Sequence, residues 1–151
     1  MSHIFLKIDN MSGESKDSAH IGWCDVKSIK WGASRNKPGV GAVNYKNLLV
    51  LTSIDKLTPT VMLYVSNGSK IRKIEISGCK QGGEQIEYYR ITLENVIVAD
   101  VLIVDSSFEP EVYYEFQADK VKIQYWEQTE TGIKGAETRS GWDIKNNSSA
   151  Y

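Results

Sequence analysis

Residues 13–32 read GESKDSAHIGWCDVKSIKWG, a polar segment that runs directly into a strand-like segment with two tryptophans. The polar part brings Glu14, Ser15, Asp17 and His20 close together in the chain. Serine and aspartate side chains bond backbone groups in turns, so these residues predict a hydrogen-bonded turn in which His20 also bonds the backbone. The turn would lead from a first strand, predicted over residues 4–9, into a second strand.

The second strand, predicted over residues 22–31, has side chains that alternate between two faces. Its two faces are Trp23, Ile29 and Trp31 on one side, and Ser28 and Lys30 on the other. In a monomer the face of Ser28 and Lys30 would meet solvent. In a ring of copies it would face the central channel.

Most of the remaining chain alternates with a period of two, which is typical of half-buried strands. Residues 47–53 predict one such strand. Ile74 and Ile76 predict the dry face of another, with Lys73, Glu75 and Ser77 on its wet face. The turn KQGGE at residues 80–84 predicts a hairpin whose second strand begins near Gln85.

The two long strands that follow change their apolar parity midway. Tyr89, Ile91 and Leu93 are odd, whereas Val96 and Val98 are even, and the partner strand changes between Phe116 and Val121. The first change falls at residues 94–95 and indicates a β-bulge or a corner. The predicted fold is mainly β, a small antiparallel two-sheet β-barrel with one short flanking α-helix.

The flanking helix is predicted from Thr58, as a hydroxyl N-cap, with Pro59 at the first helical position and Gly68 at the left-handed end. Its buried stripe is predicted from Met62 and Val65 with either Val61 or Leu63.

Residues 32–45 lack apolar periodicity and are expected to form an extended loop, and loops of that length in compact domains usually carry function. The chain is expected to be a single domain over residues 1–151, with a frayed polar tail at 146–151.

The composition is that of a soluble globular protein, with 41% hydrophobic and 25% charged residues. A net charge of −1 gives no general attraction to nucleic acid or anionic membrane, and no apolar run is long enough to span a bilayer. Lys7 and Asp9 interrupt the early apolar segment, so no signal peptide is expected. Cys24 and Cys79 are expected to be half-buried free thiols.

Catalytic and ligand-binding patterns are weak. The two histidines, His3 and His20, are not grouped with enough further ligands for a metal site. A nucleophile next to a histidine is not indicated. The carboxylate pairs Glu109–Glu111 and Glu84–Glu87 flank turns, where solvated charges are expected. The sequence therefore predicts no catalytic residues, no metal and no cofactor.

The whole chain resembles the Hcp (haemolysin-coregulated protein) family, the tube proteins of bacterial type VI secretion systems. The resemblance rests on motifs in family order, namely IFLKID, the set Gly13, Glu14, Ser15, Asp17 and His20, then Trp31-Gly32, Asp55-Lys56, Thr58-Pro59, EYYRITLENVIV at 87–98 and Gly141-Trp142-Asp143. It implies a two-sheet barrel with a flanking helix, assembled as a homohexameric ring that stacks into a tube.

The resemblance also implies partners and surfaces. The expected partners are other copies of the chain, the sheath and spike components of the secretion machine, and small effector proteins carried in the lumen, without nucleic acid or membrane insertion. Assembly would take place in the bacterial cytoplasm, followed by secretion without a signal peptide. The long loop would contact a neighbouring subunit or ring through Arg35, Asn36, Lys37, Pro38, Gly39, Val40 and Val43, and Ser28 and Lys30 would face the lumen.

Two features depart from the family pattern. Lys30 stands where a small residue is usual, and VDSSFEPEV at residues 104–112 replaces a glycine-rich loop. The alternative hypothesis is a monomeric ligand-binding β-barrel, with carbohydrate as a candidate ligand for its aromatic residues. A third, a small hydrolase, would require a cleft that assembles His20 with a nucleophile.

Overall fold

The structure is a computed structural model that describes residues 3–151 except 38, 40, 81–85, 107 and 130–131. Its strands and one helix, in chain order, are β1 (Ile4–Ile8), β2 (Cys24–Lys30), β3 (Ala33–Ser34), β4 (Asn44–Tyr45), β5 (Leu48–Ser53), α1 (Thr58–Asn67), β6 (Lys70–Cys79), β7 (Glu87–Val104), β8 (Glu111–Gln128), β9 (Lys134–Asp143) and β10 (Ser148–Ala150). The predicted KQGGE turn lies largely outside the described residues.

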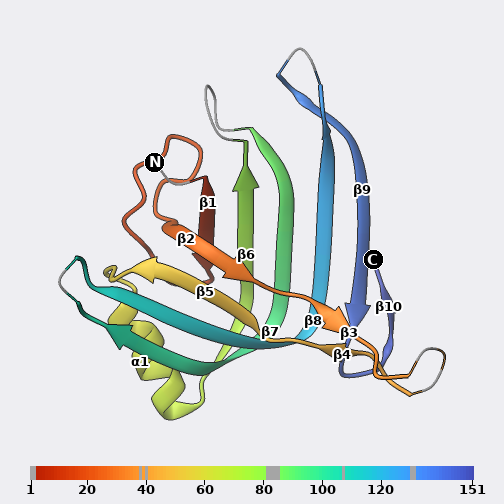
Figure 1. Cartoon of the computed structure of the whole chain (residues 1–151), viewed down its shortest axis with the longest axis horizontal. Helices are drawn as coiled ribbons and strands as arrows, with labels where there is room; N and C mark the ends of the chain where they lie inside the picture. Colours follow the sequence, from red (N-terminus) through yellow and green to blue (C-terminus); the bar gives the residue numbers. More distant parts are fainter. Residues whose placement is uncertain (1–2, 38, 40, 81–85, 107, 130–131) are drawn as a thin grey trace.

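Six antiparallel strands close into a barrel. The main sheet has the order β10-β9-β8-β5-β2-β1-β6-β7, and an additional pairing of β8 with β7 joins its ends into a ring of β8, β5, β2, β1, β6 and β7. Closure removes the exposed edges that an open sheet would have. Strands β9 and β10 continue the sheet outside the barrel (Figure 1). The predicted β-barrel fold with one short helix is confirmed.

Strands β7 and β8 both bend sharply midway, so the two halves of each strand belong to different walls of the barrel (Figure 1). At the corner Asn95 has a φ of 53°, a left-handed conformation that asparagine tolerates better than most residues. The pairs Glu94–Lys120 and Val96–Ala118 flank it without a change of register. Leu93 and Val96 are both buried, so the predicted change of parity is confirmed as a bend.

Strand β2 contains an irregularity that the sequence pattern does not reveal. Val26 pairs with Thr52 and Ser28 with Leu51, so β2 has one extra residue between these two pairs. Because a bulge of this kind reverses the alternation of faces, the buried side chains change from Cys24 and Val26 to the half-buried Ile29. The prediction that Trp23 shares a face with Ile29 and Trp31 was therefore wrong.

The helix begins and ends near the predicted residues, and Gly68 has the predicted left-handed conformation, with a φ of 69°. The N-cap, however, is Leu57, without a side-chain cap. Thr58 instead turns inward, where its hydroxyl accepts the Asp55 N–H at 3.0 Å and lies 2.6 Å from the Tyr114 hydroxyl. A buried tyrosine hydroxyl needs a polar partner, and Thr58 provides it in the core instead of capping the helix.

The buried side of the helix also differs from its predicted stripe. Val61 is fully buried and Val65 packs partly against the core, whereas Met62 and Leu63 are exposed. Tyr64 takes the place predicted for Met62. The barrel core is filled mainly by aliphatic and aromatic side chains, of which the largest are Tyr114, Phe116, Leu6, Ile8, Leu48, Ile74, Ile76 and Leu93.

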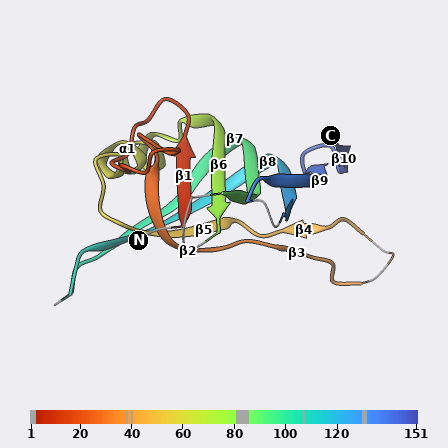
Figure 2. The same cartoon turned by 90° about the horizontal axis from the view of Figure 1, so that it is seen from above.

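Two segments expected to be irregular carry regular structure. Within residues 32–45, β3 and β4 form a short ribbon in which Ala33 pairs with Tyr45 and Ser34 with Asn44. The ribbon projects from one end of the molecule (Figure 2). The tail is not frayed, because Ser148–Ala150 pairs with Gly141–Asp143 as β10. None of the described helical residues form a helix long and apolar enough to cross a membrane.

Candidate functional site

The polar turn at residues 13–20 is held by local bonds of the predicted kind. The Asp17 N–H donates to Ser15 Oγ at 3.3 Å, and the Ala19 N–H donates to Asp17 Oδ2 at 3.2 Å. Glu14 reaches further, since its Oε2 accepts the Lys56 N–H at 2.8 Å. The turn is thereby fixed both to itself and to the segment before α1.

Gly13 lies against the backbone of the segment that leads into β2. Its N–H donates to the Gly22 carbonyl at 2.7 Å, and the Ser15 N–H donates to the Trp23 carbonyl at 2.8 Å. A Cβ on Gly13 would lie 2.6 Å from the Trp23 carbonyl oxygen, closer than real Cβ contacts allow. Only glycine fits here, because the obstructing atoms are backbone.

His20 is buried, and its ring packs against residues of β1 and β6. The ring stacks on Phe5, with centroids 4.1 Å apart, and meets Trp23 edge-on at 4.9 Å. Nδ1 lies 2.7 Å from Asp17 Oδ2 and Nε2 lies 3.0 Å from Ser77 Oγ. The expectation that the side chain bonds backbone was wrong, since side chains satisfy both nitrogens.

Ser77 connects His20 to a buried ionic cluster. Its hydroxyl donates to Glu87 Oε2 at 2.6 Å, and Glu87 also accepts from Arg90 Nε and Lys134 Nζ, each at 2.8 Å. Burial opposes the ionisation of Glu87, but the bonds from Lys134 and Ser77 and the charge of Arg90 outweigh it and lower its pKa. The predictions that Glu87 and Ser77 face solvent were both wrong.

The two polar contacts hold the imidazole from opposite sides. The single hydroxyl proton of Ser77 points to Glu87, so Ser77 Oγ is available as an acceptor for Nε2 of His20. On the other side Nδ1 lies against the carboxylate of Asp17. Together the two contacts fix the orientation of the ring.

Asp17, His20 and Ser77 have the order of an acid, a base and a nucleophile, which the sequence did not reveal. Catalysis would require Ser77 to donate its proton to His20 and to reach a substrate. Here the proton goes to Glu87 instead, and Ser77 has an exposed fraction of 0%. This arrangement suits a structural link between the turn and β6. Over the described part of the chain, no group of three or more His, Cys, Asp or Glu side chains is placed to hold a metal ion.

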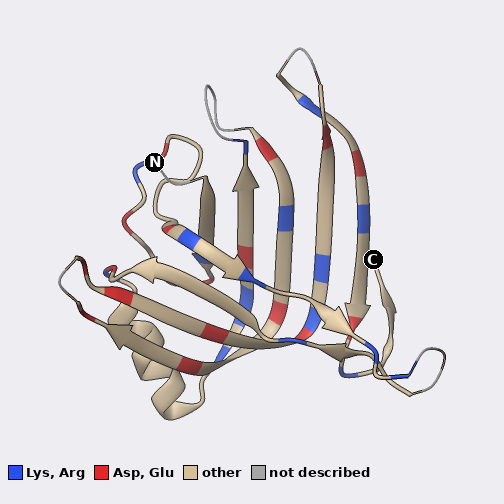
Figure 3. Cartoon of the chain, in the orientation of Figure 1, with Lys and Arg blue, Asp and Glu red and all other residues tan. Residues whose placement is uncertain are grey.

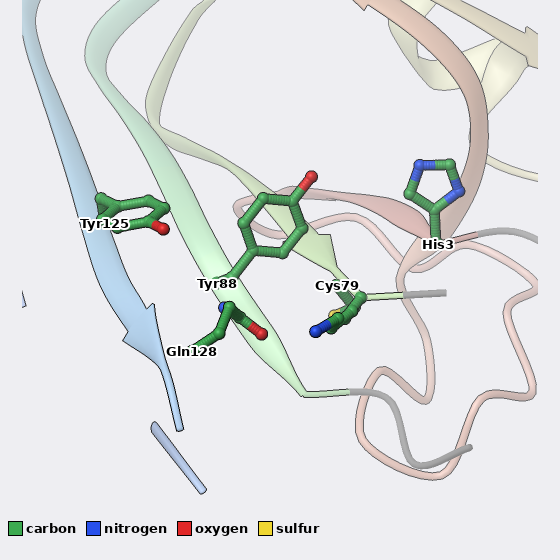
Figure 4. Close-up of a pocket in the computed structure, with 6 residues that line it drawn as sticks. His3, Cys79, Tyr88, Tyr125 and Gln128 are labelled. Atoms are coloured by element: carbon green, nitrogen blue, oxygen red, sulfur yellow. The ribbon is translucent and has the colours of Figure 1, made fainter. Parts of the chain in front are cut away.

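A pocket of about 470 Å³ lies beside the barrel mouth and is lined by His3, Cys79, Lys80, Tyr88, Tyr125 and Gln128. Figure 4 shows Tyr88 between Tyr125 and His3. The rings of Tyr88 and Tyr125 are perpendicular, with centroids 6.5 Å apart. The sequence did not predict this pocket, because a register shift at Gly78–Cys79 leaves Tyr88 outside the regular pairing.

Both cysteines are free and fully buried, rather than half-buried as predicted. Burial, reinforced by the charge of Asp55, raises the pKa of Cys24 to about 12. Burial also raises the pKa of Cys79, against a bond to Ser77 that lowers it. Both groups are therefore thiols at neutral pH, and thiols are poor nucleophiles and poor metal ligands.

The ribbon carries most of the residues predicted to contact other copies. Arg35, Asn36, Lys37 and Gly39 are exposed, Val43 is half-buried, and Pro38 and Val40 lie outside the described residues. The Arg35 guanidinium donates to the Gly41 carbonyl across the ribbon. At the ribbon base the Lys46 N–H donates to the Gly32 carbonyl at 2.9 Å, and the rings of Trp31 and Tyr45 lie 6.1 Å apart.

Ser28 and Lys30 are exposed on the outer face of the barrel wall formed by β2, β5 and β8. Across the wall, Ser28 pairs with Leu51 and Lys30 with Leu49. Strand β8 continues these rows with Tyr113 and Glu115. The face thus combines a cation, aliphatic and aromatic groups, and a carboxylate.

Comparison with known proteins identifies the relatives of this chain. Residues 5–131 match the family model described as "Type VI secretion system effector, Hcp". The protein hcp1 of Pseudomonas aeruginosa is 34% identical, over 95% of this chain and 96% of that protein. The crystal structure of Hcp1 from Salmonella typhimurium is similar with a TM-score of 0.85 and 29% identity, and the match covers 97% of each chain. A structure described as a type six secretion system protein shares the fold, with a TM-score of 0.89, 22% identity and coverage of 99% of this chain and 100% of that one.

Proposed function

The chain belongs to the Hcp family of type VI secretion proteins, and from this premise we propose that it is the tube subunit of such a system. Six copies form a ring, and the rings stack into a tube. The lumen carries small effector proteins, and the sheath and spike of the machine are the other partners. The tube is assembled in the bacterial cytoplasm and is then secreted from the cell. The proposal assigns the chain no catalytic step.

The observation that supports assembly most strongly is the ribbon of β3 and β4. It projects from an otherwise closed barrel (Figure 2), and its described pairing consists of Ala33–Tyr45 and Ser34–Asn44. An isolated two-stranded ribbon is marginally stable in water. Contact with a neighbouring copy would bury its backbone edges, which gives the length of this segment a physical reason.

The filled barrel interior also supports an assembly role. Large side chains such as Tyr114, Leu48 and Phe116 occupy the core, so a ligand would have to bind outside it. In the proposed ring the face of Ser28 and Lys30 lines the lumen, where Lys30 from six copies would present a ring of positive charge. Such a ring would favour cargo with acidic surfaces.

Electron microscopy of the purified protein tests the ring directly. The proposal expects six-fold rings with an open centre, and short stacks at high protein concentration. Particles without a channel, or rings of another symmetry, would contradict it.

A monomeric ligand-binding barrel is the second candidate, and the pocket beside Tyr88 and Tyr125 is the observation that favours it (Figure 4). Aromatic rings with a neighbouring amide are typical of sites for carbohydrates and other polar ligands that stack. A glycan array tests this function. Binding that is lost in Tyr88→Ala and in Tyr125→Ala, in a protein that stays monomeric, would favour it over the tube.

A further inference from the structure

The far end of the β7–β8 hairpin, residues 98–117, is an arm with an exposed apolar surface. Phe108 has an exposed fraction of 96%, and four other large apolar side chains of the arm are also exposed, namely Leu102, Ile103, Val104 and Tyr113. Exposed apolar side chains that gather on one segment of a soluble protein often mark an interaction site. A fully exposed phenylalanine at a projecting tip has the form of an interface anchor.

The arm is also strongly acidic. Residues 98–117 contain Asp100, Asp105, Glu109, Glu111 and Glu115, and no lysine or arginine. Lys27 contacts Glu109 and Glu111, and the Asn47 amide donates to Glu115. Asp105 and Glu109, which flank Phe108 in the sequence, are both exposed.

The opposite end of the molecule has the opposite charge. Residues 30–47, which contain the ribbon, include Lys30, Arg35, Lys37 and Lys46, and no aspartate or glutamate. The arm and the ribbon point away from each other (Figure 2), and Figure 3 shows acidic residues along the arm and basic residues along the ribbon. The net charge of −1 conceals this separation.

A pocket of about 330 Å³ lies at the ribbon base and complements the arm tip in chemistry. It is lined by Lys30, Trp31, Gly32, Lys46, Asn47 and Leu49. Trp31 and Leu49 provide apolar surface for an aromatic ring. Lys30 and Lys46 provide two cations on which flanking carboxylates can pair.

We propose that the arm of one copy docks at the ribbon base of a second copy. Phe108 enters the pocket against Trp31 and Leu49, and Asp105 pairs with Lys46. Because the two surfaces are different and lie at opposite ends, the contact is heterologous and repeats from copy to copy. It rests on the proposed function, where it is the contact between stacked rings, at the point where the lumen face of Lys30 meets the ribbon.

Crosslinking between two variants tests the contact. Phe108→Cys protein is mixed with Lys46→Cys protein under mild oxidation, and the native Cys24 and Cys79 stay buried. The proposal expects a disulfide-linked heterodimer to dominate over both homodimers. The control replaces Lys46→Cys by Lys16→Cys, an exposed position in the polar turn. An equal yield from the control, or no heterodimer at concentrations where the unmodified protein assembles, overturns the proposal.

Sedimentation of single variants separates this contact from ring formation. Phe108→Ser and Lys46→Glu should each weaken stacking by about tenfold or more while leaving the mass of the ring unchanged. Adding Asp105→Lys to Lys46→Glu should restore part of the stacking, because the pair of charges is exchanged. Stacks that persist in Phe108→Ser and in Lys46→Glu would refute the arm contact and leave the ring proposal standing. A wild-type protein that stays monomeric would refute both.

Discussion

The imidazole Nε2 of His20 lies 3.0 Å from the hydroxyl of Ser77, although 57 residues separate them in the chain. His20 belongs to the polar turn before β2, and Ser77 belongs to β6, so the bond ties the turn to the barrel wall. The Ser77 hydroxyl in turn donates a hydrogen bond to Glu87 Oε2 at 2.6 Å. The turn, β6 and β7 are therefore joined by one buried network.

Ser77→Ala should lower the free energy of unfolding by about 1–3 kcal/mol. The substitution leaves the His20 Nε2–H without its acceptor and removes a donor from Glu87, and unsatisfied buried polar groups carry a cost of that size. Denaturant unfolding measures the change. Ser28→Ala, at an exposed position, serves as the control and should change stability by less than about 0.5 kcal/mol. Equal values for the two variants would contradict a structural role for the network.

Glu87 should make stability depend on acid pH. Its pKa is lowered from the ordinary value of 4.5, so its contribution is fully present above that pH and is lost as the pH falls through the lower folded pKa. Unfolding free energies measured from about pH 7 down to about pH 3 should therefore fall less steeply below about pH 4.5 in Glu87→Gln than in the wild type. Parallel curves for the two proteins would show that Glu87 titrates normally.

Gly13→Ala should destabilise the protein by about 1–3 kcal/mol, because the added methyl overlaps backbone atoms that have little room to move. The nearest is the Trp23 carbonyl oxygen, at 2.6 Å. Gly32→Ala is the matched control from the same segment, since a Cβ there meets no atom within 4 Å. Thermal unfolding should rank Gly13→Ala clearly below Gly32→Ala. The reverse order would mean that the turn does not pack on β2 as described.

Charge reversal in the ribbon, Arg35→Glu, should weaken stacking or ring closure while the barrel stays folded. Arg35 is exposed and its described contact is local, to the Gly41 carbonyl, so the barrel does not depend on it. Sedimentation measures assembly, and circular dichroism checks the fold. Lys16→Glu makes the same change of charge in the polar turn. Unchanged assembly in Arg35→Glu would count against the ribbon as an interface.

Much of the fold follows from local signals in the sequence. Alternating residues such as Ile74 and Ile76 predicted strands, and the parity change between Leu93 and Val96 predicted the corner, because both signals lie within a few neighbouring residues. Gly68 ended the helix as predicted, since a left-handed residue needs no partner from elsewhere in the chain. The closed barrel was predicted because each of the two long strands changes its buried face midway and can therefore belong to two walls.

The errors have a common physical cause, since each depends on a partner distant in sequence. Thr58 was assigned to the helix end, but Tyr114 draws it into the core. Ser77 and Glu87 were expected to face solvent, but contacts with His20, Arg90 and Lys134 cover them. The tail was expected to fray because residues 146–151 have no alternating apolar pattern that would indicate their pairing with residues 141–143.

The interface residues in the ribbon were predicted from the family resemblance and stay a prediction. The exposure of Arg35, Asn36, Lys37 and Gly39 is compatible with contact between copies, as it is with contact to solvent. The basic charge of residues 30–47 and the acidic charge of residues 98–117 were both readable in the sequence. Their placement at opposite ends was not, because it depends on where the barrel directs the two hairpins.

The mass of the purified protein in solution tests the central claim most directly. One chain has a mass of 17.0 kDa. Light scattering coupled to size exclusion should give a main species of six times that mass, about 102 kDa, which persists on dilution because a closed ring gives every copy two neighbours. A single species of one chain mass at high concentration would contradict the tube-subunit account.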